Sequence, residues 1–277
     1  TGGTHNFVIN RKSVNISGTR EYDGTTNIAA ADISTRTDTV NSEVLAMSGG
    51  LGTTSSANVG AYNLTDTSQG TLILANGPSG ANQGLASNYT LTGGTQDYTI
   101  TQRVLSSSGS KAYDANTNAL AADITLSNLV SGETLNHSGT ASISSANAAS
   151  YTITNLAGIT LADNAGLASN YTLTGGTHNF TVNPKVISLS GSRLYDATTD
   201  AVASDLTTIS GLVGSETLNL SGTGSVTNAN VASNKTVTLG TLALADNSGL
   251  AANYTLSGGT HQLTINQRPL AATVARQ

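Results

Sequence analysis

Histidine is the side chain in this sequence best suited to acid–base chemistry near neutral pH. His5, His178 and His261 occupy one recurring position, and Gln96 stands there in a further copy of the pattern. Because an amide cannot accept and return a proton as imidazole does, no shared catalytic mechanism can depend on this position. His137 stands alone in a predicted turn. The histidines therefore predict neither a general base nor a metal ligand.

Ser108 and Lys111 have the spacing of a Ser–Lys nucleophile pair, in which a neutral lysine takes the serine proton. The equivalent positions in the other copies hold Arg20 and Arg193. Arginine stays protonated in proteins and cannot serve as that base, so the spacing predicts no nucleophilic site. The sequence thus predicts that the protein is not an enzyme.

Two short signatures recur in every copy of the pattern. Tyr–Asp occurs at Tyr22-Asp23, Tyr113-Asp114 and Tyr195-Asp196. Asn–Tyr occurs at Asn88-Tyr89, Asn170-Tyr171 and Asn253-Tyr254. In the first signature we expect the Asp to cap backbone N–H groups in an Asx-type turn, with the Tyr packed beneath it. A specific receptor site is rarely needed in every copy, so the recurrence favours structural roles.

Asp163 and Asp246, each followed by Asn, could supply oxygen ligands to calcium. No neighbouring acidic cluster completes a coordination shell, and the first copy has Ala75 in the corresponding loop. We therefore interpret both aspartates as turn residues and keep calcium as the weaker alternative. No other cofactor is expected.

The composition excludes several classes of partner. Charged residues make up 10% of the chain, against roughly 25% in an average soluble domain. The net charge is −5, and the scattered Lys and Arg form none of the basic clusters that nucleic-acid binding requires. The absence of cysteine excludes disulfides and thiol catalysis. No apolar run approaches the roughly 18 residues of a membrane-spanning helix, so no membrane span is predicted.

Internal repetition indicates how the chain is organised. Asn-Tyr-Thr-Leu occurs at 88–91, 170–173 and 253–256, in steps of 82 and 83 residues. The two ends of the chain match the closing and opening strands of the repeated pattern. The predicted divisions are 1–10 as the last strand of a preceding repeat, 11–102 as repeat 1, 103–184 as repeat 2, 185–267 as repeat 3, and 268–277 as the start of a following repeat.

Strand patterns dominate each repeat. In the closing segment of repeat 1, Tyr98 and Ile100 alternate with polar residues, which predicts a strand with one buried face. The preceding Tyr-Thr-Leu-Thr-Gly-Gly predicts a hairpin with this strand, because paired glycines accept positive φ. The opening strand is expected to end at Gly18.

Short strands separated by turns every 8 to 12 positions or so predict an all-β fold of small, Ig-like β-sandwich modules. The alternative is a β-grasp fold, in which the Ala-rich stretch at 27–33 and its counterparts form one short helix in each repeat. Junctions such as 101–103 are short and contain no glycine. We therefore expect each repeat to contact its neighbours and the array to form an elongated, semi-rigid rod.

These signatures resemble the YDG and MBG-type repeats of large Gram-negative surface adhesins, many of them filamentous-haemagglutinin-like proteins exported by two-partner secretion. The resemblance rests on the Tyr-Asp-Gly/Ala motifs and the three Gly-Leu-Ala-x-Asn-Tyr-Thr-Leu segments, and it extends over the whole chain. Ala115 and Ala197 replace Gly24, which argues against a strict need for positive φ there. The resemblance implies an extracellular stalk or fibre at the bacterial cell surface that supports adhesion and biofilm cohesion.

Two other functions compete with a stalk. Each repeat could bind a polysaccharide or host glycoprotein weakly, with many copies adding avidity. Against this, glycan sites usually expose aromatic platforms, and most tyrosines here fall at repeated positions that suit packing. Alternatively, the chain could associate with itself into filaments, by lateral edge pairing or by exchange of the terminal strands. The expected partners are therefore neighbouring repeats, a glycan, or a second copy.

Overall fold

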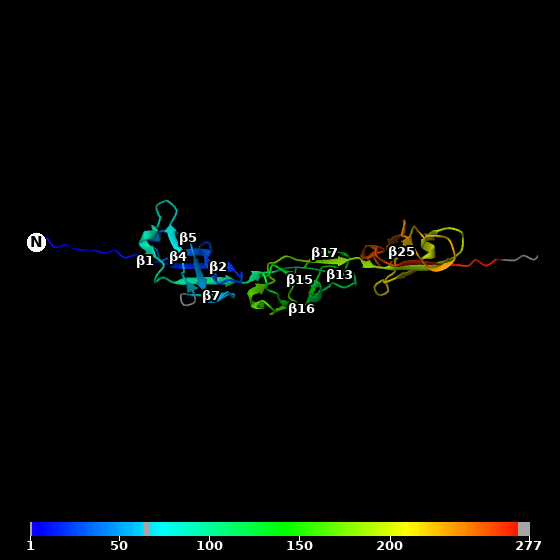
Figure 1. Ribbon diagram of the computed structural model, residues 1–277, viewed down its shortest axis with the longest axis horizontal. Helices are drawn as coiled ribbons and strands as arrows, with labels where there is room; N and C mark the ends of the chain where they lie inside the picture. The colour runs from blue at the N-terminus through cyan, green and yellow to red at the C-terminus, as the bar shows by residue number, and fades with distance from the viewer. Residues whose placement is uncertain (1, 64–66, 154, 271–277) are drawn as a thin grey trace, which may run out of the picture. The chain divides into compact units, whose positions relative to one another are not determined.

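The computed structural model describes residues 2–63, 67–153 and 155–270, which form an all-β protein (Figure 1). The predicted fold class is confirmed, because short strands dominate and their open sheets are consistent with β-sandwich modules. Every helical segment of the described residues is a three-residue 3₁₀ turn. The β-grasp alternative is therefore wrong, since its helix is absent from these residues. None of the described helical segments is long and apolar enough to cross a membrane.

The chain folds into two compact units. Unit 1 comprises Thr1–Ser106, Leu126–His137 and Leu161–Gly176. Unit 2 comprises Ser107–Thr125, Ser138–Thr160 and Thr177–Gln277. Unit 1 thus contains repeat 1 with one end of repeat 2, and unit 2 contains the remainder of repeat 2 with repeat 3.

Repeat 1 is built on a four-stranded sheet with the order β4-β2-β11-β7. Its strands are β4 (Ile33–Thr37), β2 (Asn15–Glu21), β11 (Gln96–Thr101) and β7 (Gly60–Tyr62). The smaller sheets are β3 (Asn27–Ala29) with β6 (Leu51–Thr54) and β8 (Thr67–Ser68), β5 (Leu45–Gly49) with β9 (Ile73–Asn76), and β1 (Lys12–Ser13) with β10 (Tyr89–Thr90). The 3₁₀ turns are η1 (Ala30–Asp32), η2 (Val40–Ser42) and η3 (Ala86–Asn88).

Repeat 2 has the same four-strand order, β15-β13-β20-β17. These strands are β15 (Ile124–Ser127), β13 (Ser106–Ala112), β20 (His178–Asn183) and β17 (Ala149–Thr152). The smaller sheets are β14 (Asn118–Leu120) with β16 (Asn136–Ser142) and β18 (Ile159–Ala162), and β12 (Arg103–Val104) with β19 (Tyr171–Thr172). The 3₁₀ turns are η4 (Ala121–Asp123) and η5 (Ala168–Asn170).

Repeat 3 repeats the order once more, as β24-β22-β30-β27. These strands are β24 (Thr208–Ser210), β22 (Ser188–Leu194), β30 (His261–Asn266) and β27 (Ala232–Thr236). The smaller sheets are β23 (Asp200–Val202) with β26 (Thr223–Ser225), β25 (Asn219–Ser221) with β28 (Ala243–Ala245), and β21 (Lys185–Val186) with β29 (Tyr254–Thr255). The 3₁₀ turns are η6 (Ala203–Asp205) and η7 (Ala251–Asn253).

The opening and closing strands of each repeat are parallel neighbours. β2 pairs with β11, β13 with β20, and β22 with β30. Because parallel strands point the same way, the chain enters a repeat at one end of this sheet and leaves it at the other. Entry and exit at opposite ends are what a head-to-tail series of repeats requires.

The hairpin predicted before the closing strand is wrong, because β10 pairs in parallel with β1 instead of folding back on β11. The Gly-Gly pair carries the chain closely over the opening strand. Gly93 has a φ of +83°, and a Cβ on Gly94 would lie 1.9 Å from the carbonyl oxygen of Val14. The glycines therefore serve a close crossing between sheets and not a tight two-strand turn.

The prediction that the opening strand ends at Gly18 is also wrong, since β2 continues to Glu21. A Cβ on Gly18 would lie 2.3 Å from the carbonyl oxygen of Asp32 in η1. The pairing of β2 with β4 shifts register between Ser17 and Gly18. Because Gly18 has no side chain, the 3₁₀ turn η1 can pack against the middle of β2, at the position of this bulge.

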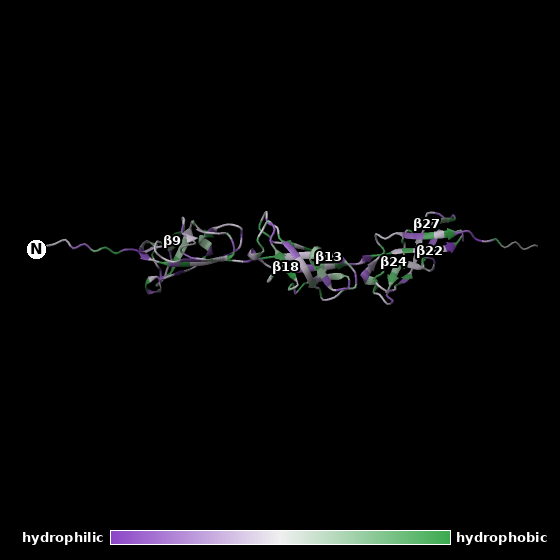
Figure 2. Cartoon of the chain, turned by 90° about the horizontal axis from the view of Figure 1, so that it is seen from below, coloured by the Kyte–Doolittle hydropathy of each residue, from purple (hydrophilic) through white to green (hydrophobic). Residues whose placement is uncertain are grey.

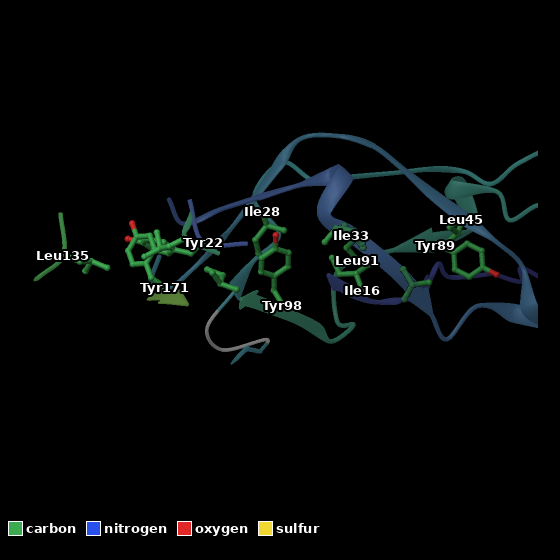
Figure 3. Close-up of a cluster of buried hydrophobic side chains, with 13 residues drawn as sticks. Ile16, Tyr22, Ile28, Ile33, Leu45, Tyr89, Leu91, Tyr98, Leu135 and Tyr171 are labelled. Atoms are coloured by element: carbon green, nitrogen blue, oxygen red, sulfur yellow. The ribbon is translucent and has the colours of Figure 1, made fainter. Parts of the chain in front are cut away.

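The closing strands bury one face, as their alternation predicts. Tyr98 and Ile100 of β11 are buried, and so are Phe180, Val182, Leu263 and Ile265 at the same positions of β20 and β30. Figure 2 shows apolar residues in green interleaved with polar residues along the strands. In unit 1, Tyr98 lies beside Ile28 of β3, so the core fills the space between the four-stranded sheet and the smaller ones (Figure 3).

Candidate functional site at the repeat junctions

The aspartate of each Tyr–Asp signature forms the expected Asx-type turn. Asp23 Oδ1 accepts the backbone N–H of Thr25 at 2.8 Å. The same bond joins Asp114 to Asn116 N at 3.1 Å and Asp196 to Thr198 N at 3.0 Å. A cation three residues earlier also pairs with each carboxylate, and these cations are Arg20, Lys111 and Arg193. Each aspartate therefore caps the local turn and forms an ion pair beside it.

The residue after each Asp keeps a left-handed backbone in all three copies. The φ angles are +81° at Gly24, +63° at Ala115 and +68° at Ala197. The expectation that this position has no strict need for positive φ is therefore wrong. The two alanines adopt a conformation that costs an L-residue about 1–2 kcal/mol.

The tyrosine of the first signature forms a clamp with two residues of the next repeat, all within unit 1. The Tyr22 hydroxyl donates to Glu133 Oε1 at 2.5 Å, and the Tyr171 hydroxyl donates to Glu133 Oε2 at 2.6 Å. The two rings meet edge to face with centroids 5.5 Å apart (Figure 3). The backbone N–H of Val130 donates to the Tyr171 hydroxyl at 3.1 Å. One carboxylate therefore holds tyrosines from both repeats.

Unit 2 contains the same clamp at the next junction. The Tyr113 hydroxyl donates to Glu216 Oε1 at 2.6 Å, and the Tyr254 hydroxyl donates to Glu216 Oε2 at 2.5 Å. The rings again meet edge to face, with centroids 5.4 Å apart. The backbone N–H of Val213 donates to the Tyr254 hydroxyl at 3.0 Å. The recurrence of every bond identifies the clamp as a built feature of the repeat.

The asparagine of the second signature adds a further pair of bonds at each junction. Asn170 accepts the backbone N–H of Val59 at 2.9 Å and donates to Asn58 Oδ1 at 3.0 Å. In unit 2, Asn253 accepts the N–H of Ala148 at 2.8 Å and donates to Asn147 Oδ1 at 3.0 Å. Asn170 and Asn253 are both buried, so each satisfies its amide in the neighbouring repeat.

The junction in unit 1 is also part of the apolar core. Leu105, Leu135 and Tyr171 of repeat 2 belong to the same buried cluster as Tyr22 and the core of repeat 1 (Figure 3). At its edge, the backbone N–H of Val104 donates to Glu21 Oε1 at 2.6 Å. The linkage thus combines apolar burial with directional hydrogen bonds and is not a solvated linker.

The clamp tyrosines stay protonated at neutral pH. Burial raises the pKa of Tyr22 to about 12, and the hydrogen bond to Glu133 and its negative charge act in the same direction. The same causes raise the pKa of Tyr171 and of Tyr254 to about 12 and raise the pKa of Tyr113. The clamp tyrosines therefore keep their protons near neutral pH and act as hydrogen-bond donors.

The recurring histidine position is also structural. His178 and His261 are buried at the start of β20 and β30, as Gln96 is in β11. His178 Nδ1 lies 2.9 Å from Ser107 Oγ. His261 Nδ1 accepts the backbone N–H of Leu189 at 3.2 Å. Both rings therefore bond across the parallel pair of opening and closing strands.

Asp163 and Asp246 act as turn caps. Asp163 Oδ1 accepts the backbone N–H of Ala168 at 2.7 Å, and Asp246 Oδ1 accepts that of Ala251 at 2.6 Å. Within the described residues, no group of three His, Cys, Asp or Glu side chains is arranged to hold a metal ion. The bonds match the turn interpretation of both aspartates, and the calcium alternative gains no further ligand.

An open groove of about 540 Å³ lies along β4, η2 and the start of β5 in repeat 1. Half of its lining residues are Ser or Thr, none is aromatic, and Asp38 and Glu43 are among them. Asp38 pairs with Lys12 at 2.7 Å, and Glu43 accepts the Tyr89 hydroxyl at 2.6 Å. Both acids of the groove therefore have structural partners within repeat 1.

Sequence reasoning identified the clamp tyrosines and asparagines but missed the glutamate between them. The chain has four glutamates, Glu21, Glu43, Glu133 and Glu216. The last three occupy one repeated position, each followed by Thr or Val and then Leu. In a chain with so few charged residues, that recurrence was the signal that could have identified the glutamate. The remaining glutamate, Glu21, also forms a hydrogen bond at a junction.

The repeated sheet order and the junction bonds define a protein of linked β-sandwich modules. The family model of the YDG domain matches residues 98–179 and 179–262. The chain belongs to the YDG domain family. No curated protein and no solved structure was found to match it. The two matched segments begin within the closing strands, so the repeat boundaries at 103 and 185 stay predictions.

Proposed function

We propose that this chain is a structural stalk or fibre segment of an exported bacterial surface adhesin. The observation that supports this most is the tyrosine–glutamate clamp, present in both units with the same bonds. A linkage of this kind transmits position and force from one repeat to the next. The proposed role is mechanical and non-catalytic.

The energetics of the clamp suit that role. Hydrogen bonds to a charged acceptor contribute about 1.5–3 kcal/mol each, and every clamp has two of them on one carboxylate. The bonds between asparagine side chains and the neighbouring backbone add to this. Bending a junction would break several of these bonds at once, so each junction resists bending more than a flexible linker does.

The surface composition supports an exported location. Charged residues are only 10% of the chain, so Ser, Thr and Asn supply most of its hydration. The parallel opening and closing strands let one repeat follow another without reversing the chain. Both features suit a long, hydrated spacer that presents a binding tip carried elsewhere in the protein.

A bacterial assay tests the stalk role. Residues 103–184, one predicted repeat, are removed in frame from the protein in its own bacterium, which joins Gln102 to Lys185 in register. We expect antibody detection on intact cells and unchanged binding specificity, because the tip is untouched, with a shorter reach. Loss of the specific binding itself would contradict a spacer role, and failure to detect the chain on intact cells would contradict the surface location.

A glycan array probes the competing function with the same chain. Tyr195 and Phe7 are the exposed aromatic residues among those described, and they lie in different units. We therefore expect no glycan binding that grows with the number of repeats. Reproducible binding that rises from one repeat to three would replace the stalk with a multivalent receptor.

A further inference from the structure

The strands by which the chain enters and leaves each repeat lie side by side at the centre of its main sheet. In repeat 3 they are β22 and β30, with β24 on one side and β27 on the other. Their parallel register runs without a shift from Leu189 opposite His261 to Leu194 opposite Asn266. β2 with β11 and β13 with β20 pair over the same six positions. We call these two strands the entry–exit pair.

Tension along the chain acts on the entry–exit pair at its two opposite ends. Because the strands are parallel, the chain enters at the start of β22 and leaves at the end of β30. A pull on the two ends of the repeat therefore slides one strand along the other and loads all the hydrogen bonds of the pair together. A pull applied at one end of the pair would instead separate the strands one bond at a time.

Very little chain lies between one entry–exit pair and the next. β11 ends at Thr101 and β12 begins at Arg103, while β20 ends at Asn183 and β21 begins at Lys185. β12 and β21 lead directly into the opening strands β13 and β22. Tension that reaches one repeat is therefore passed to the next pair without first extending a linker.

The chain that enters a repeat is held by a second parallel pairing. In repeat 3, Lys185 and Val186 of β21 lie opposite Tyr254 and Thr255 of β29. The backbone N–H of Ile187 donates to the carbonyl oxygen of Thr255 at 3.0 Å. A pull on the entering chain loads this pairing in the same sliding direction, so it adds to the resistance of the entry–exit pair.

Packing shields the bonds of the entry–exit pair from water. Leu189 on β22 and Leu263 and Ile265 on β30 are at most 1% exposed. Both strands also have a paired neighbour on their outer side, so neither is a sheet edge. Water competes for a backbone hydrogen bond where it can reach the donor and the acceptor. The bonds at the centre of this sheet are therefore replaced by water only after the strands have moved.

The tyrosine of each Tyr–Asp signature closes the far end of the entry–exit pair through its backbone. The N–H of Tyr22 donates to the carbonyl oxygen of Thr101 at 2.9 Å. The N–H of Tyr113 donates to that of Asn183, and the N–H of Tyr195 to that of Asn266, each also at 2.9 Å. These bonds lie where the chain leaves the repeat, so an outgoing pull loads them first.

We propose that the entry–exit pair is the load-bearing element of each repeat, so that a repeat keeps its length under tension until the whole pair shears. Repeat 3 carries this element entirely within unit 2. The role goes beyond that of a stalk, because a spacer can present a binding tip without resisting a pull. A repeat that unfolded at low force would remove the load-bearing role and leave the stalk role standing.

Pulling repeat 3 in two directions tests the proposal. The chain has no cysteine, so handles can be attached to Pro184→Cys with Asn266→Cys, which shears the pair, or to Leu194→Cys with Asn266→Cys, which peels it. All three sites are exposed, so both variants should melt at the temperature of the unaltered chain. In optical tweezers, the shearing direction should require a force at least about threefold higher, because several bonds break together.

The same measurement locates the resistance within the repeat. Leu263→Ala removes a buried side chain from the entry–exit pair, whereas Leu242→Ala removes one outside the four-stranded sheet. Both should lower the melting temperature, but only Leu263→Ala should lower the shearing force, because the contacts of Leu242 break after the pair has failed.

Equal unfolding forces in the two directions would overturn the proposal, and this comparison requires only exposed substitutions. An equal fall of the shearing force in Leu263→Ala and Leu242→Ala would overturn it as well, since the resistance would then belong to the whole module. Each unfolding event is identified by its gain in length, about 0.35 nm for every residue between the handles.

Discussion

Glu133 accepts hydroxyls from tyrosines of two repeats, so its side chain belongs to neither repeat alone. Glu43 is the natural comparison, because it makes the bond to its own tyrosine but has no neighbouring one in the described chain. The difference between the two positions isolates what the junction contributes. The same substitution at Glu133 and at Glu43 therefore compares the stability that a glutamate contributes inside a junction with what it contributes outside one.

Replacing Glu133 with alanine should destabilise the chain more than the same change at Glu43. Glu133→Ala leaves two tyrosine hydroxyls without an acceptor and should cost about 3–6 kcal/mol, whereas Glu43→Ala loses one such bond and should cost about 1.5–3 kcal/mol. Urea unfolding followed by circular dichroism measures both as shifts of the midpoint. Equal losses at the two positions would show that the second tyrosine contributes nothing.

Alkaline pH should open the clamps. The folded pKa of Tyr22, Tyr171 and Tyr254 is about 12, above the value of about 10 for tyrosine in an unfolded chain. The folded state therefore holds these protons more tightly, and the resulting stability is complete below pH 10 and is lost between about pH 10 and 12. Thermal unfolding measured across this range should show a flat profile followed by a fall.

Phenylalanine substitutions provide the control for this pH dependence. Tyr22→Phe and Tyr171→Phe keep the rings and remove the groups that ionise, so the double variant should be less stable at pH 8 and lose less stability on going to pH 12. A fall of the same size in the double variant would assign the alkaline transition to other groups, such as Tyr98, whose pKa is also raised by burial.

At the scale of the element, the turn after each Tyr–Asp signature requires a left-handed backbone. In repeats 2 and 3 an alanine occupies this position and is therefore strained. Ala115 and Ala197 have φ angles of +63° and +68°, where Gly24 is unstrained. Ala115→Gly and Ala197→Gly should each raise stability by about 0.5–1 kcal/mol, after the entropy cost of glycine in the unfolded chain is subtracted. Thermal denaturation of each variant measures the gain.

The reverse substitution in repeat 1 completes this comparison. Gly24→Ala should lower stability by more than the two alanine-to-glycine variants raise it. The new alanine would have to adopt a positive φ, and its Cβ would also lie 2.9 Å from Val130 Cγ1 across the junction. If Ala115→Gly and Ala197→Gly do not raise stability and Gly24→Ala does not lower it, the left-handed turn is not a source of strain.

The alternation of apolar residues predicted the closing strands well, because period two is a local property of the chain. Tyr98 and Ile100 are buried as expected. The pairing of strands was not predictable in this way: Gly93 and Gly94 suggest a hairpin, and only the distant carbonyl of Val14 explains why they cross over instead. Close approach between segments distant in sequence leaves no local pattern.

At the candidate site, too, the recurring residues could be predicted from the sequence and the long-range contact could not. Tyr22 and Asn170 were singled out from the sequence because they recur, and they do meet at a junction. Their partner Glu133 was overlooked because it lies in a polar turn, where a lone acid usually has only a solvating role. Its partners lie 111 and 38 residues away, a separation that no window of sequence reveals.

At the scale of the whole molecule, function depends on whether a junction holds its two repeats in one orientation. The clamp, the buried asparagine and the shared core in unit 1 all oppose bending there. The chain contains no cysteine, so spin labels can be attached at any chosen pair of sites. Exposed Thr19 in repeat 1 and exposed Ala165 in repeat 2 lie on opposite sides of this junction within unit 1.

The most direct test is the distribution of distances between labels on Thr19→Cys and Ala165→Cys, measured by double electron–electron resonance. The account predicts one narrow distribution, which broadens when Glu133→Ala is added and stays narrow when Glu43→Ala is added. A broad distribution in the chain with its clamp intact would contradict a stiff junction. So would a narrow distribution that Glu133→Ala leaves unchanged, because the clamp would then not be what holds the repeats.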